Sequence, residues 1–146
     1  MTGIDDIEQI KLLKARYFRL LDTKQWDAWK DCFTEDLSIT VEMSRSEPGR
    51  PGEVLKQPQG RENFVEALRV TLADAPTVHH GHMPEITLTG PDTASGIWAM
   101  ADIVAFAGQP VMYGYGHYHE HYRKEAGAWR IARLHLTRLK VDYRQD

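Results

Sequence analysis

The segment ASGIWAMAD, residues 94–102, decides the fold class, because its side chains alternate between the two faces of an extended strand. Trp98, Met100 and Asp102 fall on one of these faces. Similar strand-like runs cover about 78–89, 111–124 and 128–142, and the junctions between the four runs read GPD, GQP and EAG. The second half of the chain is therefore predicted to be an antiparallel sheet.

The first half of the chain is predicted to be mainly helical. Apolar residues recur at steps of three and four over 4–22, and shorter helical patterns cover 25–33 and 61–74. A half-buried strand is expected at 37–43. Helices followed by antiparallel strands are typical of the α+β class. We expect one domain over residues 1–146, a cone-shaped curved sheet wrapped around the N-terminal helices, with a cavity for a small ligand.

Two further features bear on the entrance and the curvature of this cone. Residues 44–59 contain three prolines and two glycines among charged residues, and this loop is long enough to act as a lid. Gly96, Gly114 and Gly116 lie inside predicted strands, which indicates bends in the sheet.

Composition narrows the possible partners and locations. The formal net charge is −3 and basic residues are dispersed, so no nucleic-acid partner is expected. Cys32 is the single cysteine, which excludes an intramolecular disulfide and a thiolate metal site, and it is expected in the core. The N-terminal residues are charged where a signal peptide would be apolar, and no run approaches about 18 apolar residues. We expect no membrane partner and a cytoplasmic location.

Histidines are concentrated in two short segments, TVHHGH at 77–82 and YGHYHEH at 115–121. Histidine titrates near neutral pH and is the commonest metal ligand, so the segments indicate proton chemistry or a metal. His117, His119 and His121 project from one face of a strand, where neighbours stand about 7 Å apart and do not converge. They form either a metal site or a polar stripe along a cavity or subunit contact. We predict no metal.

A carboxylate partner would give a histidine a catalytic role. Asp22 ends the first predicted helix, where it either caps the next helix or reaches a histidine. A carboxylate that holds one ring nitrogen sets the tautomer and makes the other nitrogen a general base. Asp102 is either a buried acid with a raised pKa or an exposed residue near a strand end.

Several motifs together resemble the SnoaL-like branch of the nuclear-transport-factor-2-like superfamily, and within it scytalone dehydratase and bile-acid 7α-dehydratase. They run in order along nearly the whole chain: ARYFRLLDTKQW (15–26), TVHHGHMPEI (77–86), ASGIWAMAD (94–102), GYGHY (114–118) and WRI (129–131). The resemblance implies a cone-shaped α+β barrel, no cofactor and a homo-oligomer, a trimer rather than a dimer. It also implies that Asp22 and His79 work as a catalytic pair, with Tyr17 and Asp102 at matching positions.

The function predicted from these features is a cofactor-independent lyase that carries out a dehydratase-type elimination on a small cyclic or aromatic substrate. His79, held by Asp22, would remove a proton next to a carbonyl group, and Tyr17 would donate a hydrogen bond to the developing oxyanion. Asp102 or His117 would assist the leaving group, and the other residues expected at the substrate are Tyr115 and Trp98.

Three alternatives remain open from the sequence. The same base without a leaving group would make the protein an isomerase. The fold also hosts binding modules without catalytic activity. A metal-dependent enzyme would use His117, His119 and His121.

Overall fold

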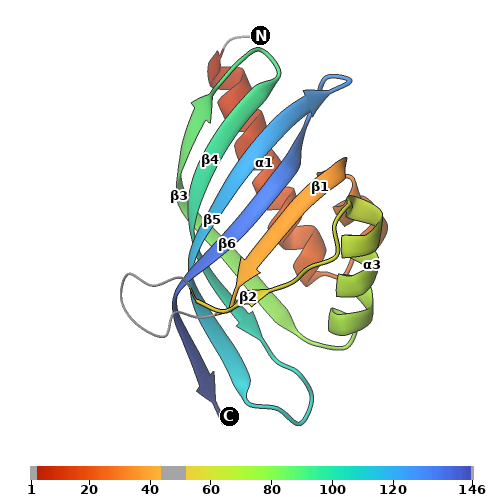
Figure 1. Cartoon of the computed structure of the whole chain (residues 1–146), viewed down its shortest axis with the longest axis vertical. Helices are drawn as coiled ribbons and strands as arrows, with labels where there is room; N and C mark the ends of the chain where they lie inside the picture. Colours follow the sequence, from red (N-terminus) through yellow and green to blue (C-terminus); the bar gives the residue numbers. More distant parts are fainter. Residues whose placement is uncertain (1–2, 44–51, 146) are drawn as a thin grey trace.

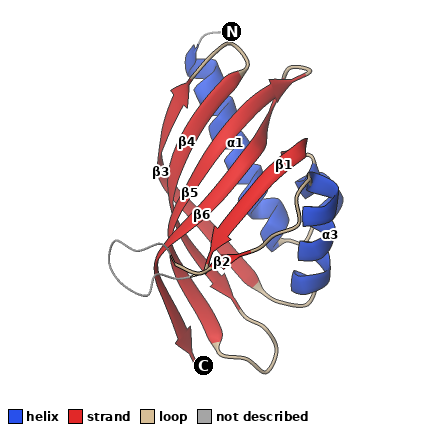
Figure 2. Ribbon diagram, in the orientation of Figure 1, coloured by secondary structure: helices blue, strands red, loops and turns tan. Residues whose placement is uncertain are grey.

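The chain folds into a curved six-stranded sheet with its helices on one side (Figures 1 and 2). The computed structural model describes residues 3–43 and 52–145. The helices are α1 (Gly3–Asp22), α2 (Trp26–Lys30) and α3 (Arg61–Leu72). The strands are β1 (Phe33–Glu42), β2 (Val54–Leu55), β3 (Thr77–Leu88), β4 (Thr93–Val104), β5 (Val111–Glu125) and β6 (Ala128–Arg144). The predicted α+β class with N-terminal helices is confirmed.

The strand order is β2-β1-β6-β5-β4-β3, so the sheet is open, with β2 and β3 at its edges. Strands β3 to β6 pair antiparallel in chain order, as predicted. The exception is β1, which runs parallel to β6 and makes the sheet mixed rather than wholly antiparallel. No hairpin joins β1 to β6, so a tight turn does not set their relative direction.

The element boundaries differ from the prediction mainly around the short helix. Helix α2 ends at Lys30, and β1 therefore begins at Phe33 instead of at 37. Residues 44–51 of the predicted lid lie outside the described residues. In the remainder of that loop, Val54 and Leu55 pair with β1.

The core lies between α1, α2, α3 and one face of the sheet, which we call the inner face. The rings of Trp29, Phe33 and Phe64 pack edge-on or tilted against one another at centroid distances of 4.9–5.9 Å. Cys32 is 3% exposed, and burial raises the pKa of its thiol to about 11, so it belongs to the core as predicted. The inner face is buried along β4 at Ala94, Trp98, Met100, Asp102 and Val104.

An ion pair lies fully buried inside this core. The Lys14 ammonium on α1 lies 2.7 Å from Glu120 Oε2 on β5, and it is 3.7 Å from the ring centroids of both Tyr17 and Tyr118. The Tyr122 hydroxyl donates to the other Glu120 oxygen at 2.8 Å. Burial lowers the pKa of Lys14, and the Glu120 carboxylate opposes this shift. Each charge is therefore compensated where water is excluded.

Candidate active site

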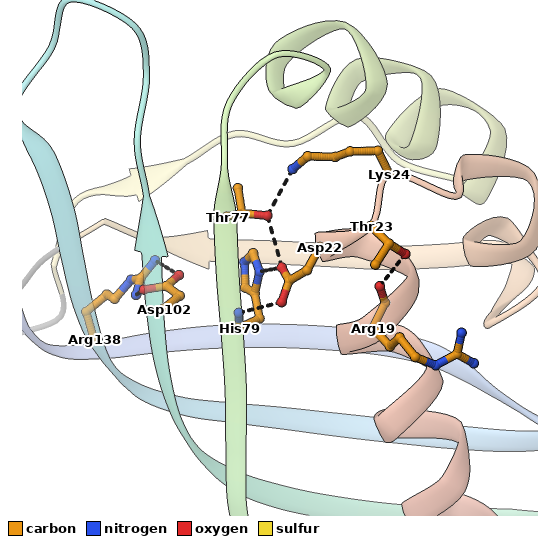
Figure 3. Close-up of polar contacts among 8 residues, drawn as sticks. All are labelled: Arg19, Asp22, Thr23, Lys24, Thr77, His79, Asp102 and Arg138. Carbon is orange, nitrogen blue, oxygen red and sulfur yellow. Dashed lines mark hydrogen bonds and ion pairs between the residues drawn. The ribbon is translucent and has the colours of Figure 1, made fainter.

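The structure brings Asp22 and His79 into contact at the junction of α1 and β3 (Figure 3). Helix α1 ends at Asp22, and β3 begins at Thr77, so His79 is the third residue of that strand. Asp22 Oδ1 is 2.7 Å from His79 Nδ1. Asp22 does not cap the next helix: α2 has Gln25 at its N-cap and makes no side-chain cap hydrogen bond.

Two further donors fix the Asp22 carboxylate. The Thr77 hydroxyl donates to Oδ1 at 2.9 Å, and the backbone N–H of His79 donates to Oδ2 at 2.8 Å. Lys24, in the left-handed region at φ 60°, follows α1 and donates from Nζ to the Thr77 hydroxyl at 2.9 Å. Both carboxylate oxygens are therefore engaged, and the carboxylate cannot rotate without losing these bonds.

This geometry defines the tautomer of His79. An ionised carboxylate only accepts hydrogen bonds, so the imidazole donates from Nδ1–H and keeps the lone pair on Nε2. Within residues 3–43 and 52–145, Nε2 makes no hydrogen bond. The His79 residue is 9% exposed and the Asp22 side chain 21%, so the pair is shielded from bulk water without being sealed. In this geometry Nε2 is the ring nitrogen that can accept a proton.

Asp102 lies beside His79 on the inner face, because the two residues are direct cross-strand partners in the β3–β4 ladder. Asp102 is buried, and its carboxylate accepts two hydrogen bonds from Arg138, at 2.7 and 3.0 Å (Figure 3). A Cβ at position 114 would collide with both partners, so only glycine leaves room for this pair. Asp102 is therefore an ion-paired carboxylate rather than an isolated acid or an exposed residue.

Arg138 on β6 also lies near the site, and the sequence pattern did not show which face of the sheet its side chain takes. The β5–β6 register shifts twice, with the pairing passing over Ala132 and Leu139. Each shift breaks the alternation of side chains along β6. Pairing of Arg138 with Gly116 then turns its side chain to the inner face, where it is 4% exposed.

Tyr17 and Trp98 are both buried on the inner side of the sheet. Tyr17 is 4% exposed, and its ring packs against that of Tyr118 at a centroid distance of 6.0 Å. Burial, followed by the nearby Glu120 charge, raises the pKa of Tyr17, so its hydroxyl keeps its proton. Trp98 donates from Nε1 to the Tyr122 hydroxyl at 2.9 Å.

Tyr115 and His117 lie on the opposite, outer face of the sheet, so the structure does not bring them to His79. Their ladder partners on β4 are Ala101 and Ala99, which alternate with the buried Met100 and Asp102. The inner positions of β5 are taken by Gly114, Gly116 and Tyr118 instead. The expectation that Tyr115 and His117 share a site with His79 is therefore wrong, because each lies one residue along β5 from a position that faces the inner side.

The outer face also carries the other histidines, namely His80, His82, His119, His121 and His135. The rings of His117 and His119 are 6.3 Å apart, and those of His119 and His135 are 6.0 Å apart. Within the described ranges, no group of three or more His, Cys, Asp or Glu side chains has the arrangement of a metal site. The histidines on β5 form a polar stripe along the sheet.

A curved sheet that covers its inner face with N-terminal helices defines a class of small α+β proteins, those with the nuclear-transport-factor-2-like fold. The SnoaL-like domain family matches residues 2–135, and the chain belongs to this family. The described helices include none that could span a membrane.

Solved structures with the same fold include several bacterial proteins. One is a proposed scytalone dehydratase from Novosphingobium aromaticivorans, with 18% identity, a TM-score of 0.79, and coverage of 99% of this chain and 91% of that one. Another is a hexachlorocyclohexane dehydrochlorinase of type 2, with 14% identity, a TM-score of 0.75, and coverage of 97% and 90%. A Mycobacterium tuberculosis protein of unknown function has 26% identity, a TM-score of 0.72, and coverage of 94% and 76%.

Proposed function

We propose that this protein is a cofactor-independent lyase in which His79, oriented by Asp22, is the general base. The observation that carries the proposal is the 2.7 Å contact between Asp22 Oδ1 and His79 Nδ1, which leaves Nε2 without a partner among the described residues. Two structural relatives are named for eliminations, one of water and one of hydrogen chloride. A small cyclic or aromatic substrate and a homotrimer are further parts of the proposal.

In the first step, His79 Nε2 removes a proton from a carbon next to a carbonyl group. The Asp22 carboxylate stabilises the imidazolium that forms, since it already accepts the Nδ1–H bond. Tyr17, whose hydroxyl keeps its proton because burial raises its pKa, donates a hydrogen bond to the enolate oxygen. General base catalysis of this kind typically contributes about 10²–10⁴ in rate.

The leaving group then needs a proton from a source other than Asp102 or His117, the two residues that the sequence predicted for this role. Both oxygens of Asp102 are held by Arg138, and His117 is on the outer face. In our proposal, the His79 imidazolium returns its proton to the departing hydroxyl. The electron pair of the enolate forms the carbon–carbon double bond, the carbon–oxygen bond breaks, and water leaves. One imidazole thus serves as base and acid, which requires both substrate groups on one side of the ring.

An isomerase is the second candidate, and the pairing of Asp102 with Arg138 favours it. Without a separate acid for a leaving group, His79 could return its proton to another carbon of the same enolate. Both reactions begin with the same proton transfer, so they share the site and differ in the substrate.

A panel of cyclic β-hydroxy ketones and chlorinated cyclohexanes, incubated in D₂O, tests the proposal. Loss of water or HCl identifies a lyase, and a product of unchanged composition that carries deuterium at a different carbon identifies an isomerase. We expect His79→Gln to abolish either reaction. The matched control is His121→Gln, which removes an exposed outer-face imidazole and should keep full turnover. Turnover that survives in His79→Gln, or binding with neither elimination nor exchange, would contradict a catalytic His79.

A further inference from the structure

A second candidate site lies on the outer face of the sheet, across the strands from Asp22 and His79. It is a groove of about 620 Å³ formed by β3, β4, β5 and β6. We call it the histidine groove and define it by His119, His121, Arg133, His135 and Thr137. Its volume is within the usual range for sites that bind small organic molecules.

The charges in the groove favour an anionic ligand. Arg133 makes no ion pair or hydrogen bond within the described part of the chain, although its guanidinium always carries a charge. Glu85 is the carboxylate side chain among the lining residues, since Glu120 contributes its backbone here and its carboxylate binds Lys14 on the inner face. Thr87 and Ser95 add hydroxyl donors, whereas the Thr137 hydroxyl donates to the backbone carbonyl of His117 at 3.4 Å.

The groove also contains the imidazoles of His119, His121 and His135. His119 lies between Ile97 and His135 in the β4–β5–β6 ladder, and its Nε2 is 3.1 Å from the Thr137 hydroxyl. Burial lowers the pKa of His119, the neighbouring His135 and His117 add to the shift, and Glu42 from β1 opposes it. At neutral pH the His119 ring is therefore mainly uncharged, and an anion placed beside it would favour the protonated form.

We propose that the histidine groove binds a small organic carboxylate with a planar ring. The carboxylate pairs with the Arg133 guanidinium, which matches it with two parallel N–H donors. The ring lies against Ile97 and the imidazoles of His119 and His135, which supply flat apolar surface. An anion at Arg133 favours the protonated form of the nearby His119 ring, so affinity rises as the pH falls.

Benzoate is a suitable probe, because it stays ionised at both pH 8 and pH 6. Titration into ¹⁵N-labelled full-length protein without a histidine tag, followed by two-dimensional NMR, should give saturable shifts in the groove residues. Affinity should increase at least about threefold from pH 8 to pH 6. His119→Gln should reduce this increase, so its loss of affinity relative to the wild type should be larger at pH 6 than at pH 8.

Charge variants separate the groove from general anion binding. Arg133→Gln should weaken benzoate binding about tenfold or more, since it removes a charged hydrogen-bond donor pair. Arg16→Gln, which neutralises an exposed arginine on α1, should leave affinity unchanged. His79→Gln should also bind benzoate like the wild type.

Three outcomes would overturn the proposal. They are the absence of saturable shifts, shifts confined to the surroundings of Asp22 and His79, and equal affinity in Arg133→Gln and the wild type. A fourth such outcome combines the titration with sedimentation of the same sample. It is an oligomer in which a second copy covers the groove residues, so that they do not respond to benzoate.

Discussion

Two carboxylate–histidine pairs occupy opposite faces of the same sheet, and they differ in how the carboxylate is held. On the inner side, both oxygens of Asp22 are engaged, and Oδ1 lies 2.7 Å from His79 Nδ1. On the outer side, Glu42 Oε1 lies 3.6 Å from His135 Nε2, beyond hydrogen-bonding distance, and Glu42 Oε2 has no partner among the described residues. One pair is oriented and the other is only adjacent.

The comparison shows that the number of histidines does not locate the proposed chemistry. The outer face carries most of the histidines of the chain, whereas the inner face carries His79 alone among the described histidines. What distinguishes His79 is a carboxylate fixed by a helix end and a strand start, which sets the tautomer. The first three predictions change the inner face and use the outer face as their control.

The largest effect is expected from Asp22→Asn. The amide keeps the size of the side chain but can no longer stabilise an imidazolium, so the rate of elimination or isomerisation should fall by about 10²–10⁴. The measurement is kcat on the substrate that the D₂O panel identifies. Glu42→Gln alters the outer pair in the same way and should keep the wild-type kcat. Equal losses in the two variants would remove the distinction between the pairs.

Glu120→Gln should strongly reduce the free energy of unfolding. It leaves the Lys14 ammonium buried without a counter-charge, a change that typically costs about 3–5 kcal/mol. Urea unfolding followed by circular dichroism measures the loss. Glu85→Gln, at an exposed position of the outer face, should change the same quantity by less than about 0.5 kcal/mol. An unchanged free energy of unfolding in Glu120→Gln would mean that the Glu120 charge does not stabilise buried Lys14.

Gly114→Ala should have a smaller destabilising effect. The added methyl group meets Arg138 and Asp102, and such overpacking typically costs about 1–3 kcal/mol. Thermal unfolding provides the measurement, and Ser95→Ala on the outer face is the control. If Gly114→Ala unfolds like the wild type, the pair of Asp102 and Arg138 can move without cost.

The smallest effect concerns pH and His119. Burial lowers the pKa of His119 in the folded protein below its value of 6.5, so the unfolded chain takes up the proton first. This contribution to stability is fully present above pH 6.5 and is lost as the pH falls through 6.5 toward the folded pKa. His119→Gln should therefore flatten the dependence of unfolding free energy on pH between 7 and 5. Ser95→Ala, which removes no titrating group, should retain the wild-type slope, and an unchanged slope in His119→Gln would refute the assignment.

Much of the fold followed from local patterns in the sequence. The alternation in β4 and the turn residues after it predicted the four-stranded antiparallel part, because hairpin neighbours pair through short turns. The parallel pairing of β1 with β6 could not be predicted in this way, since the partners, such as Phe33 and Ile131 or Val41 and Leu136, lie more than 90 residues apart and no turn connects them.

The candidate site was predictable where a family motif covered it and not where strand register decided it. The Asp22–His79 contact came from the resemblance together with the pairing logic of carboxylates and imidazoles. Tyr115 and His117 were placed on the wrong side, because a strand face depends on a one-residue offset. The burial of Lys14 and Arg138 has no local signal, since each depends on a partner on a distant strand.

The tautomer of His79 tests the role of Asp22 most directly, and long-range ¹H–¹⁵N correlation of the imidazole nitrogens in the neutral ring measures it. We expect a protonated Nδ1 and an unprotonated Nε2 in the wild type, with this preference lost in Asp22→Asn. A proton on Nε2 in the wild type, or the same tautomer in both proteins, would contradict an Asp22-oriented base.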